Sequence, residues 1–275
     1  MTTIVARKPV TSLQKAVLAA VVLYLGGILL LPLGALAGRL IQAGQPPVLT
    51  ALQDEAAMHG LFISLVLGVL AVIVGGVFGV AGALVLVRQR FFGRRLVDAL
   101  VDMPLAVSPV MAGLAFLSVF GRGGWLEPFF TFMGVKVTFA FPGMVIATLF
   151  VTLPFVLREV EYVLEELGIT EEEAAASLGA SPWQTFWYVT LPNLRYGLGY
   201  GLVLTMARAL GEFGAVLVLG GAISGKTQTA TTFIYAALDE RKDAAAYGMA
   251  ILLAMASIAL LGLLEWMKVR KEKSV

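Results

Sequence analysis

Two charged residues within an apolar stretch of the chain are the first candidates for chemistry. Arg208 and Glu212 lie within residues 197–219, and charged groups that deep in a membrane usually face a partner or a water-filled cavity. Their i, i+4 spacing places both side chains on one face of a helix. One interpretation is an ion pair that locks the helices together. The other is that this face lines a water-filled pathway through the membrane, where Glu212 partly neutralises Arg208 so that an anion is not trapped.

A second candidate is a match to a nucleotide phosphate-binding loop. Residues 220–227 fit the pattern G-x4-G-K-[ST], but that loop needs a preceding strand and a following helix in a soluble unit. Here the segment follows an apolar stretch and falls on the side that we assign to the outside, where ATP is absent. We interpret it as a Gly-rich outer turn. An alternative is that Ser224, Thr227, Lys226 and the backbone amides, groups that suit an oxyanion, line the outer mouth of a pathway.

The residue types that most other chemistry needs are scarce. The chain has no cysteine, so it forms no disulfide, thiolate metal site or iron–sulfur cluster. Its single histidine, His59, excludes a multi-histidine metal site, and we interpret His59 as a solvated loop residue. We therefore expect no metal or cofactor on this chain and no bond-making activity.

The composition points to a membrane protein. The chain has 275 residues, of which 59% are hydrophobic and 14% charged, with a mean hydropathy of +0.89. Soluble domains are about a quarter charged, so soluble enzymes and nucleic-acid binders are disfavoured. One helical span takes roughly 20 apolar residues, so the length suits about six spans without a separate soluble domain. We predict an all-α polytopic membrane protein, a single domain over residues 1–275 with its core at 60–267.

Six apolar stretches can be read along the chain. The first, residues 16–37, is longer than the apolar region of a signal peptide, so we expect a retained span. Pro104 and Pro109 interrupt the third stretch, where they either shape a gate or simply bend a helix. Glycine pairs at 75/79 and 197/201 predict close helix packing. The remaining predicted spans are residues 60–87, 99–120, 139–157, 197–219 and 244–267.

Charge placement predicts the orientation. With both termini inside, the inner segments carry 13 Lys and Arg residues and the outer segments 6, which favours cytoplasmic termini. Arg7 and Lys8 contribute to this excess. Asp102, near the inner end of the third stretch, is within reach of a pairing with Arg94, Arg95 or Arg208, and a capping or snorkelling role is favoured over a pathway role.

The inner loop at residues 158–195 is unusually long and acidic. Long connections usually have structure or function of their own, and we predict helix lying on the cytoplasmic surface. Helices that bind lipid surfaces favour Lys and Arg, whereas this loop would be repelled by anionic lipid, so a protein partner is favoured. The acidic residues are Glu159, Glu161, Glu165, Glu166, Glu171, Glu172 and Glu173.

This loop carries the most specific motif of the chain. It resembles the EAA loop of the membrane subunits of ATP-binding-cassette (ABC) importers, E-A-A-x3-G-x9-I-x-L-P, with Val in place of Ile. Small side chains leave a shallow helix face, glycine permits a tight turn, and Pro suits the first turn of the next span. The matching positions are Glu173, Ala174, Ala175, Gly179, Val189, Leu191 and Pro192.

Three further segments extend the resemblance to the sulfate/molybdate branch of these permeases. They are residues 153–159, 179–187, which include Trp183, and 207–216, and the second half looks most like the W-type permeases of sulfate and thiosulfate importers. The resemblance implies a type I importer permease (MetI-like) fold in a bacterial inner membrane.

The resemblance also implies partners and a substrate. A separate cytoplasmic ATPase would bind ATP and magnesium and contact residues 173–187, and an extracytoplasmic protein would deliver the oxyanion. The second permease would be a T-type chain or another copy. Sulfate or thiosulfate is the first expectation, and molybdate or tungstate the alternative. The rival class, an ion-coupled secondary transporter, would leave the EAA-type loop unexplained.

Overall fold

The computed structural model describes residues 11–42 and 46–273, and every regular element in those ranges is a helix. Arg7 and Lys8, which contribute to the predicted orientation, lie outside them. The elements are α1 (Ser12–Gln42), α2 (Pro47–Gln53), α3 (Glu55–Arg88), α4 (Arg94–Ala106), α5 (Pro109–Phe120), α6 (Glu127–Phe132), α7 (Phe141–Leu167), α8 (Thr170–Ser177), α9 (Pro182–Thr185), the π-helical turn η1 (Phe186–Thr190), α10 (Leu191–Leu210), α11 (Gly214–Gly220), α12 (Ala230–Asp239) and α13 (Asp243–Lys273).

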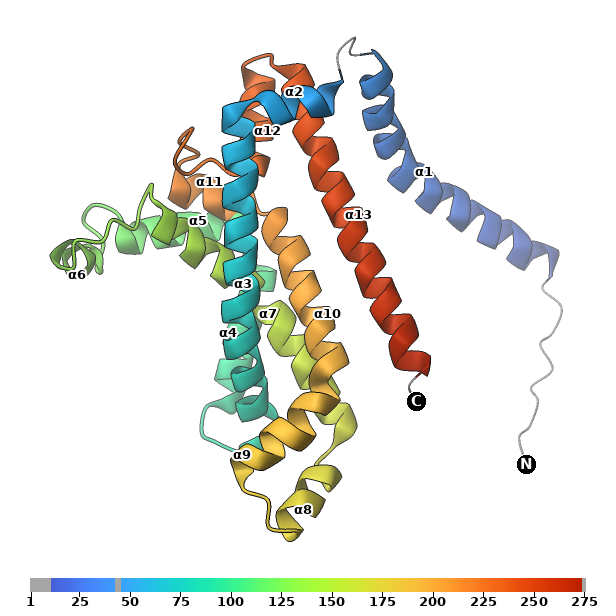
Figure 1. Cartoon of the computed structure of the whole chain (residues 1–275), viewed down its shortest axis with the longest axis vertical. Helices are drawn as coiled ribbons and strands as arrows, with labels where there is room; N and C mark the ends of the chain where they lie inside the picture. The colour runs from blue at the N-terminus through green and yellow to red at the C-terminus, as the bar shows by residue number, and fades with distance from the viewer. Residues whose placement is uncertain (1–10, 43–45, 274–275) are drawn as a thin grey trace.

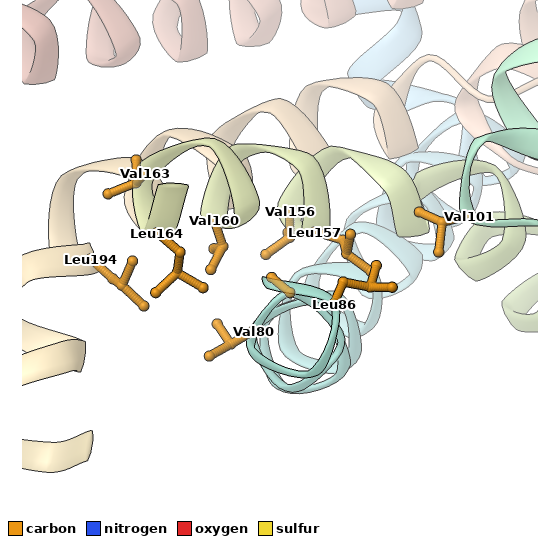
Figure 2. Close-up of a cluster of buried hydrophobic side chains, with 10 residues drawn as sticks. Val80, Leu86, Val101, Val156, Leu157, Val160, Val163, Leu164 and Leu194 are labelled. Carbon is orange, nitrogen blue, oxygen red and sulfur yellow. The ribbon is translucent and has the colours of Figure 1, made fainter. Parts of the chain in front are cut away.

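The centre of the fold is a three-helix packing of α3, α7 and α10 (Figure 1). Val156, Val160 and Leu164 of α7 are fully or almost fully buried and point toward α3 (Figure 2). Val80 and Leu86 of α3 meet them. This aliphatic cluster lies in the half of the bundle that ends at α8 and α9, so it supports the base of the acidic loop.

The two predicted glycine pairs lie at these helix contacts and confirm the packing interpretation. A Cβ on Gly79 would come within 2.9 Å of the Val156 side chain, and one on Gly197 within 2.4 Å of the Val163 side chain. Gly201 faces backbone, because its Cβ would lie 3.0 Å from Val156 Cα. The helices therefore approach more closely than any side chain would allow.

The prediction of about six spans is confirmed in number when each bent helix pair counts as one span. Four described helices are long and apolar enough to cross a membrane, and two bent pairs raise the total to six. The third predicted span is an elbow, because the chain bends by 114° between α4 and α5. Ser108 precedes Pro109 and is extended (ψ 136°), because proline disfavours helical backbone in the residue before it. Pro104 lies inside α4 and Pro109 in the first turn of α5.

Other predicted boundaries are corrected. Helix α7 runs through Leu167, well beyond the predicted end of the fourth span, because Val160 and Leu164 remain buried against α3 and α10. His59 is not in a loop. It lies on α3 and is half-buried, because Asp54 starts that helix early by accepting a 3.0 Å hydrogen bond from the Ala57 backbone N–H.

The two ends of the bundle carry different elements. Helices α2 and α12 lie at one end, and α8 and α9 lie at the other (Figure 1). Helix α1 stands beside α13, away from the central packing (Figure 1), and nearly all of its described side chains are exposed. An apolar helix exposed on this scale suits contact with lipid or with another membrane helix.

We predict that Gly201→Ala destabilises the bundle. The new methyl would press on the backbone of Val156, which cannot move aside without shifting α7, and overpacking of this kind costs about 1–3 kcal/mol. The thermal unfolding midpoint of the purified protein should fall. Gly26→Ala on α1 is the control, since its Cβ would meet nothing within 4 Å. Equal midpoints for the two variants would contradict the packing argument.

Candidate functional site

Arg208 and Glu212 form the predicted ion pair at the junction of α10 and α11. Arg208 Nη1 lies 2.7 Å from Glu212 Oε2. The Glu212 side chain is 1% exposed, whereas that of Arg208 is 30% exposed. The prediction that one helix face carries both is wrong in detail, because α10 ends at Leu210 and Glu212 lies in the break before α11, where the chain bends by 57°.

The surroundings of Glu212 explain why a carboxylate is tolerated there. Its Oε1 accepts a 3.0 Å hydrogen bond from the Ala215 backbone N–H in the first turn of α11, and its backbone oxygen accepts one of 2.6 Å from Thr231 Oγ1 on α12. A buried carboxylate is stable only when paired and hydrogen-bonded. The pair therefore joins α10, α11 and α12, and leaves the Arg208 guanidinium partly accessible.

The turn at residues 220–227 lacks the context of a phosphate-binding loop. It follows a helix, α11, instead of a strand. Thr227, at the position where such loops hold magnesium, is 3% exposed. Its Oγ1 donates to the Gly220 carbonyl at 2.6 Å and accepts from the Ile223 N–H at 3.0 Å, so it closes the turn itself.

Ser224 and Lys226 are exposed at the tip of this turn. Ser224 borders an open hollow of about 520 Å³ whose wall also includes Asp54, Glu55 and His59. Two carboxylates in the wall would repel an oxyanion. The electrostatics of this hollow therefore disfavour the pathway-mouth interpretation of Ser224.

The acidic loop is shorter than predicted, because residues 158–167 belong to α7 and 191–195 to α10. The part between them begins with two short helices, α8 and α9, joined by a tight turn. The segment from Glu173 to Trp187 is not one helix: α8 ends at Ser177, and Gly179 turns the chain in a left-handed conformation, with φ +88°. Ser181 then caps α9 in a capping box with Gln184. The predicted turn at Gly179 is confirmed, and Glu173 and Ala174 lie exposed on α8.

Leu191 and Pro192 start the next span as predicted, because α10 begins at Leu191 with Pro192 in its first turn, but they do not end the surface element. Helix α9 passes through the π-helical turn η1 directly into α10, and the Leu191 N–H bonds to the Phe186 carbonyl five residues back. Pro192 has no N–H to donate, and wider turns of this kind accommodate such defects. The surface element and the following span are thus mechanically continuous.

Apolar side chains crowd the tip of this loop. Leu178, Trp183 and Tyr188 are 88%, 68% and 80% exposed, and they surround or adjoin an open groove of about 350 Å³ beside Gly179. Trp183 packs edge-on against Trp187 with ring centroids 5.6 Å apart. Exposed apolar patches of this kind mark interaction sites. Sequence analysis missed Leu178 and Tyr188, although the density of aromatic residues after Pro182 was a signal.

Asp102 does not pair with any of the three arginines predicted. It bonds instead to Arg158 Nε of α7 at 2.8 Å, and Asp98 bonds to the same guanidinium at 2.6 Å. Glu161 is a third carboxylate on Arg158. The reason is the extra length of α7, which carries Arg158 alongside α4. This cluster attaches α4 to α7 next to the elbow at Pro109.

Comparison with known proteins places this geometry in context. The family described as "Binding-protein-dependent transport system inner membrane component" matches residues 71–273. "Sulfate transport system permease protein CysW" of Synechocystis sp. is 44% identical over 263 residues, covering 95% of each chain. CysW of Escherichia coli K12 is 41% identical over 90% of this chain and 86% of its own. CysT of the same organism is 40% identical over 85% and 84%.

Solved structures show the same fold at low sequence identity. A chain of a bacterial alginate ABC transporter, in complex with an alginate-bound periplasmic protein, superposes with a TM-score of 0.77 at 20% identity, covering 94% of both chains. A chain of the MetNI methionine ABC transporter gives 0.57 at 18% identity, covering 78% of this chain and 97% of that one. The predicted all-α, MetI-like permease fold is confirmed.

We predict that Arg208→Ala impairs transport more than assembly. The expected loss of uptake is at least tenfold, because on the pathway interpretation the partly exposed guanidinium at the α10–α11 break meets the transported anion. The measurements are uptake and the amount of intact complex.

A double variant separates the two interpretations of the pair. Removing Arg208 alone leaves a buried unpaired carboxylate, which costs about 3–5 kcal/mol, whereas Arg208→Gln combined with Glu212→Gln leaves no charge. Normal complex without uptake in the double variant supports a pathway role. Normal complex with normal uptake would show that the pair only locks the helices.

Proposed function

The chain belongs to the family of binding-protein-dependent transport system inner membrane components, and from this we propose that it is the permease subunit of an ABC importer that admits sulfate or thiosulfate to the cytoplasm. The observation that carries the substrate is the 44% identity to a protein named as a sulfate permease, extending over 95% of both chains. Relatedness along the whole length includes every span and the acidic loop.

We propose that ATP hydrolysis takes place on a separate cytoplasmic ATPase, which binds ATP and magnesium. The surface formed by α8, Gly179 and α9 is its docking site. Support comes from the exposed apolar side chains of Leu178, Trp183 and Tyr188 and from the acidic first turn of α8. Because α9 continues through η1 into α10, a displacement of the docking surface would pass directly to a membrane span.

We propose that both termini are cytoplasmic and that the end bearing α2 and α12 faces an extracytoplasmic oxyanion-binding protein. The excess of Lys and Arg on the inner segments supports this orientation. The described end of α13 also points toward the end that carries α8 and α9 (Figure 1). The second permease would be a related T-type chain, or a second copy of this one.

Uptake of labelled anions tests the substrate. Proteoliposomes that contain the complex, its binding protein and internal ATP should accumulate sulfate, and thiosulfate should compete. Accumulation of molybdate without sulfate would overturn the substrate assignment. Accumulation that continues without the ATPase would instead favour an ion-coupled secondary transporter. Native mass spectrometry of the complex would distinguish one permease species from two.

We predict that Gly179→Asp abolishes uptake or makes ATP hydrolysis independent of the binding protein, while the chain still inserts in the membrane. The change adds a side chain at φ +88° and a carboxylate beside an acidic helix. Glu173→Ala should weaken ATPase pull-down, because it removes an exposed charge from the docking surface. The assays are pull-down and substrate-stimulated hydrolysis in liposomes.

Gly179→Asn is the matched control. Asn has the size of Asp and tolerates left-handed backbone, but it adds no charge, so its effect should be milder. Wild-type pull-down and normal coupling in Gly179→Asp would remove the main support for docking at this surface.

We predict that Lys226→Ala leaves ATP hydrolysis by the full complex within about twofold of the wild-type rate. The lysine lies at the exposed tip of a turn that follows a helix and has none of the surroundings of a nucleotide site. Crosslinking of an ATP analogue to Lys226 would overturn both this interpretation and the proposed orientation.

A further inference from the structure

Arg88, the last residue of α3, binds the acidic loop at several points. Its Nε lies 3.0 Å from Glu172 Oε2, and its Nη2 lies 3.3 Å from Glu172 Oε1. The guanidinium also donates to the backbone carbonyls of Leu164, at 3.2 Å, and Gly168, at 2.6 Å. The Arg88 and Glu172 side chains are only 18% and 24% exposed, so solvent screens the pair little.

The two carbonyls belong to the end of α7. The last four carbonyls of a helix have no partner within it, and a cation near that end is favourable because of the helix dipole. Leu164 lies in the last turn of α7, and Gly168 caps it. The guanidinium of Arg88 therefore hydrogen-bonds two backbone carbonyls at the end of α7 and also binds the Glu172 carboxylate.

Glu172 extends the link to the start of the following span. Thr190, buried in η1, donates its hydroxyl to Glu172 Oε1 at 3.0 Å. Beside it, Asn193 of α10 donates to Glu171. One carboxylate on α8 thus joins the end of α3 to the turn that leads into α10.

Few other interactions fix the position of helix α8. It is eight residues long and none of its residues is buried. Isolated helices this short are not stable in water, and without an apolar anchor the orientation of α8 depends on its polar links. The strongest of those described is the link from Glu172 to Arg88.

Building on the proposed docking of an ATPase at α8, we propose that Arg88 and Glu172 form a coupling clamp. Arg88 is a positioning residue: it holds α8 at a set angle to α3, α7 and η1, so that a displacement of α8 moves α3 together with α10. The planar fork of arginine is required, because lysine offers a single point charge that cannot reach the carboxylate and both carbonyls with the same geometry.

Distance measurement tests the clamp independently of any transport assay. The chain has no cysteine, so spin labels at Gln89→Cys and Ser177→Cys report only the spacing between the end of α3 and α8. The labelled chain is diluted with unlabelled chain in the assembled complex. The measured distances then come from pairs of labels within one chain. The parent should give a narrow distance distribution, and Arg88→Gln and Glu172→Gln should broaden it.

Matched controls lie close by in the chain. Arg90→Gln and Glu165→Gln remove the same charges from exposed positions, and the distribution should stay narrow in both. A narrow distribution in Arg88→Gln, or equal broadening in Arg90→Gln, would overturn the clamp. If Arg88→Gln does not assemble, Arg88→Lys and Glu172→Gln decide the question by the same measurement.

Coupling is the second readout. The ratio of anion imported to ATP hydrolysed should fall at least fivefold in Arg88→Gln and Glu172→Gln, and less in Arg88→Lys, while hydrolysis continues. The double variant should be no worse than either single one, since both remove the same link. Additive losses, or an unchanged ratio with a broadened distribution, would overturn the coupling role. Absence of sulfate import in the parent would instead refute the proposed function and leave the distance result standing.

Discussion

The structure depends on the close approach of α7 to α3 and α10. Lipid tails are as apolar as the side chains of the spans, so the hydrophobic effect contributes little to helix association in the membrane. The spans associate instead through tight van der Waals packing. Val156 provides that contact on both sides, against Gly79 of α3 and Gly201 of α10. Each glycine places helix backbone where any side chain would collide. The remaining elements are arranged around this contact.

Polar links attach the elements that this packing does not hold. Arg158 binds two carboxylates of α4 and so attaches the α4 half of the elbow to α7. Arg208 and Glu212 bridge the break between α10 and α11. Arg88 and Glu172 hold α8 at the end of the bundle. The Arg208–Glu212 and Arg88–Glu172 links lie at a break or an end of a helix, where unpaired backbone groups and partial exposure make a charge tolerable. The Arg158 link joins the sides of α4 and α7. The structure thus combines a closely packed centre with outer elements that polar links attach to it.

Much of the candidate site could be predicted because its signals are local. The EAA-type pattern needs only residues 173–192, and the Arg208–Glu212 pair needs only four positions of spacing. The predictions that proved wrong also relied on local sequence signals. The chain after Leu157 reads as the start of a polar loop, yet α7 continues because burial of Val160 and Leu164 outweighs the glutamates around them. Leu191 and Pro192 read as a break between the surface element and the next span, yet the π-helical turn η1 joins α9 to α10 without one.

The amino-acid sequence by itself determined the membrane class, the number of apolar stretches, the acidic loop with its glycine turn, and the glycine faces that pack. These follow from composition and from spacings of a few residues, which helix geometry converts directly into shared faces. Only the tertiary structure decided the 114° elbow, the three carboxylates on Arg158 and the clamp between Arg88 and Glu172. The residues of that clamp are 84 positions apart in the chain. No local pattern relates them, and they meet because α3 and α7 lie side by side, so that the end of α3 reaches the chain leaving α7.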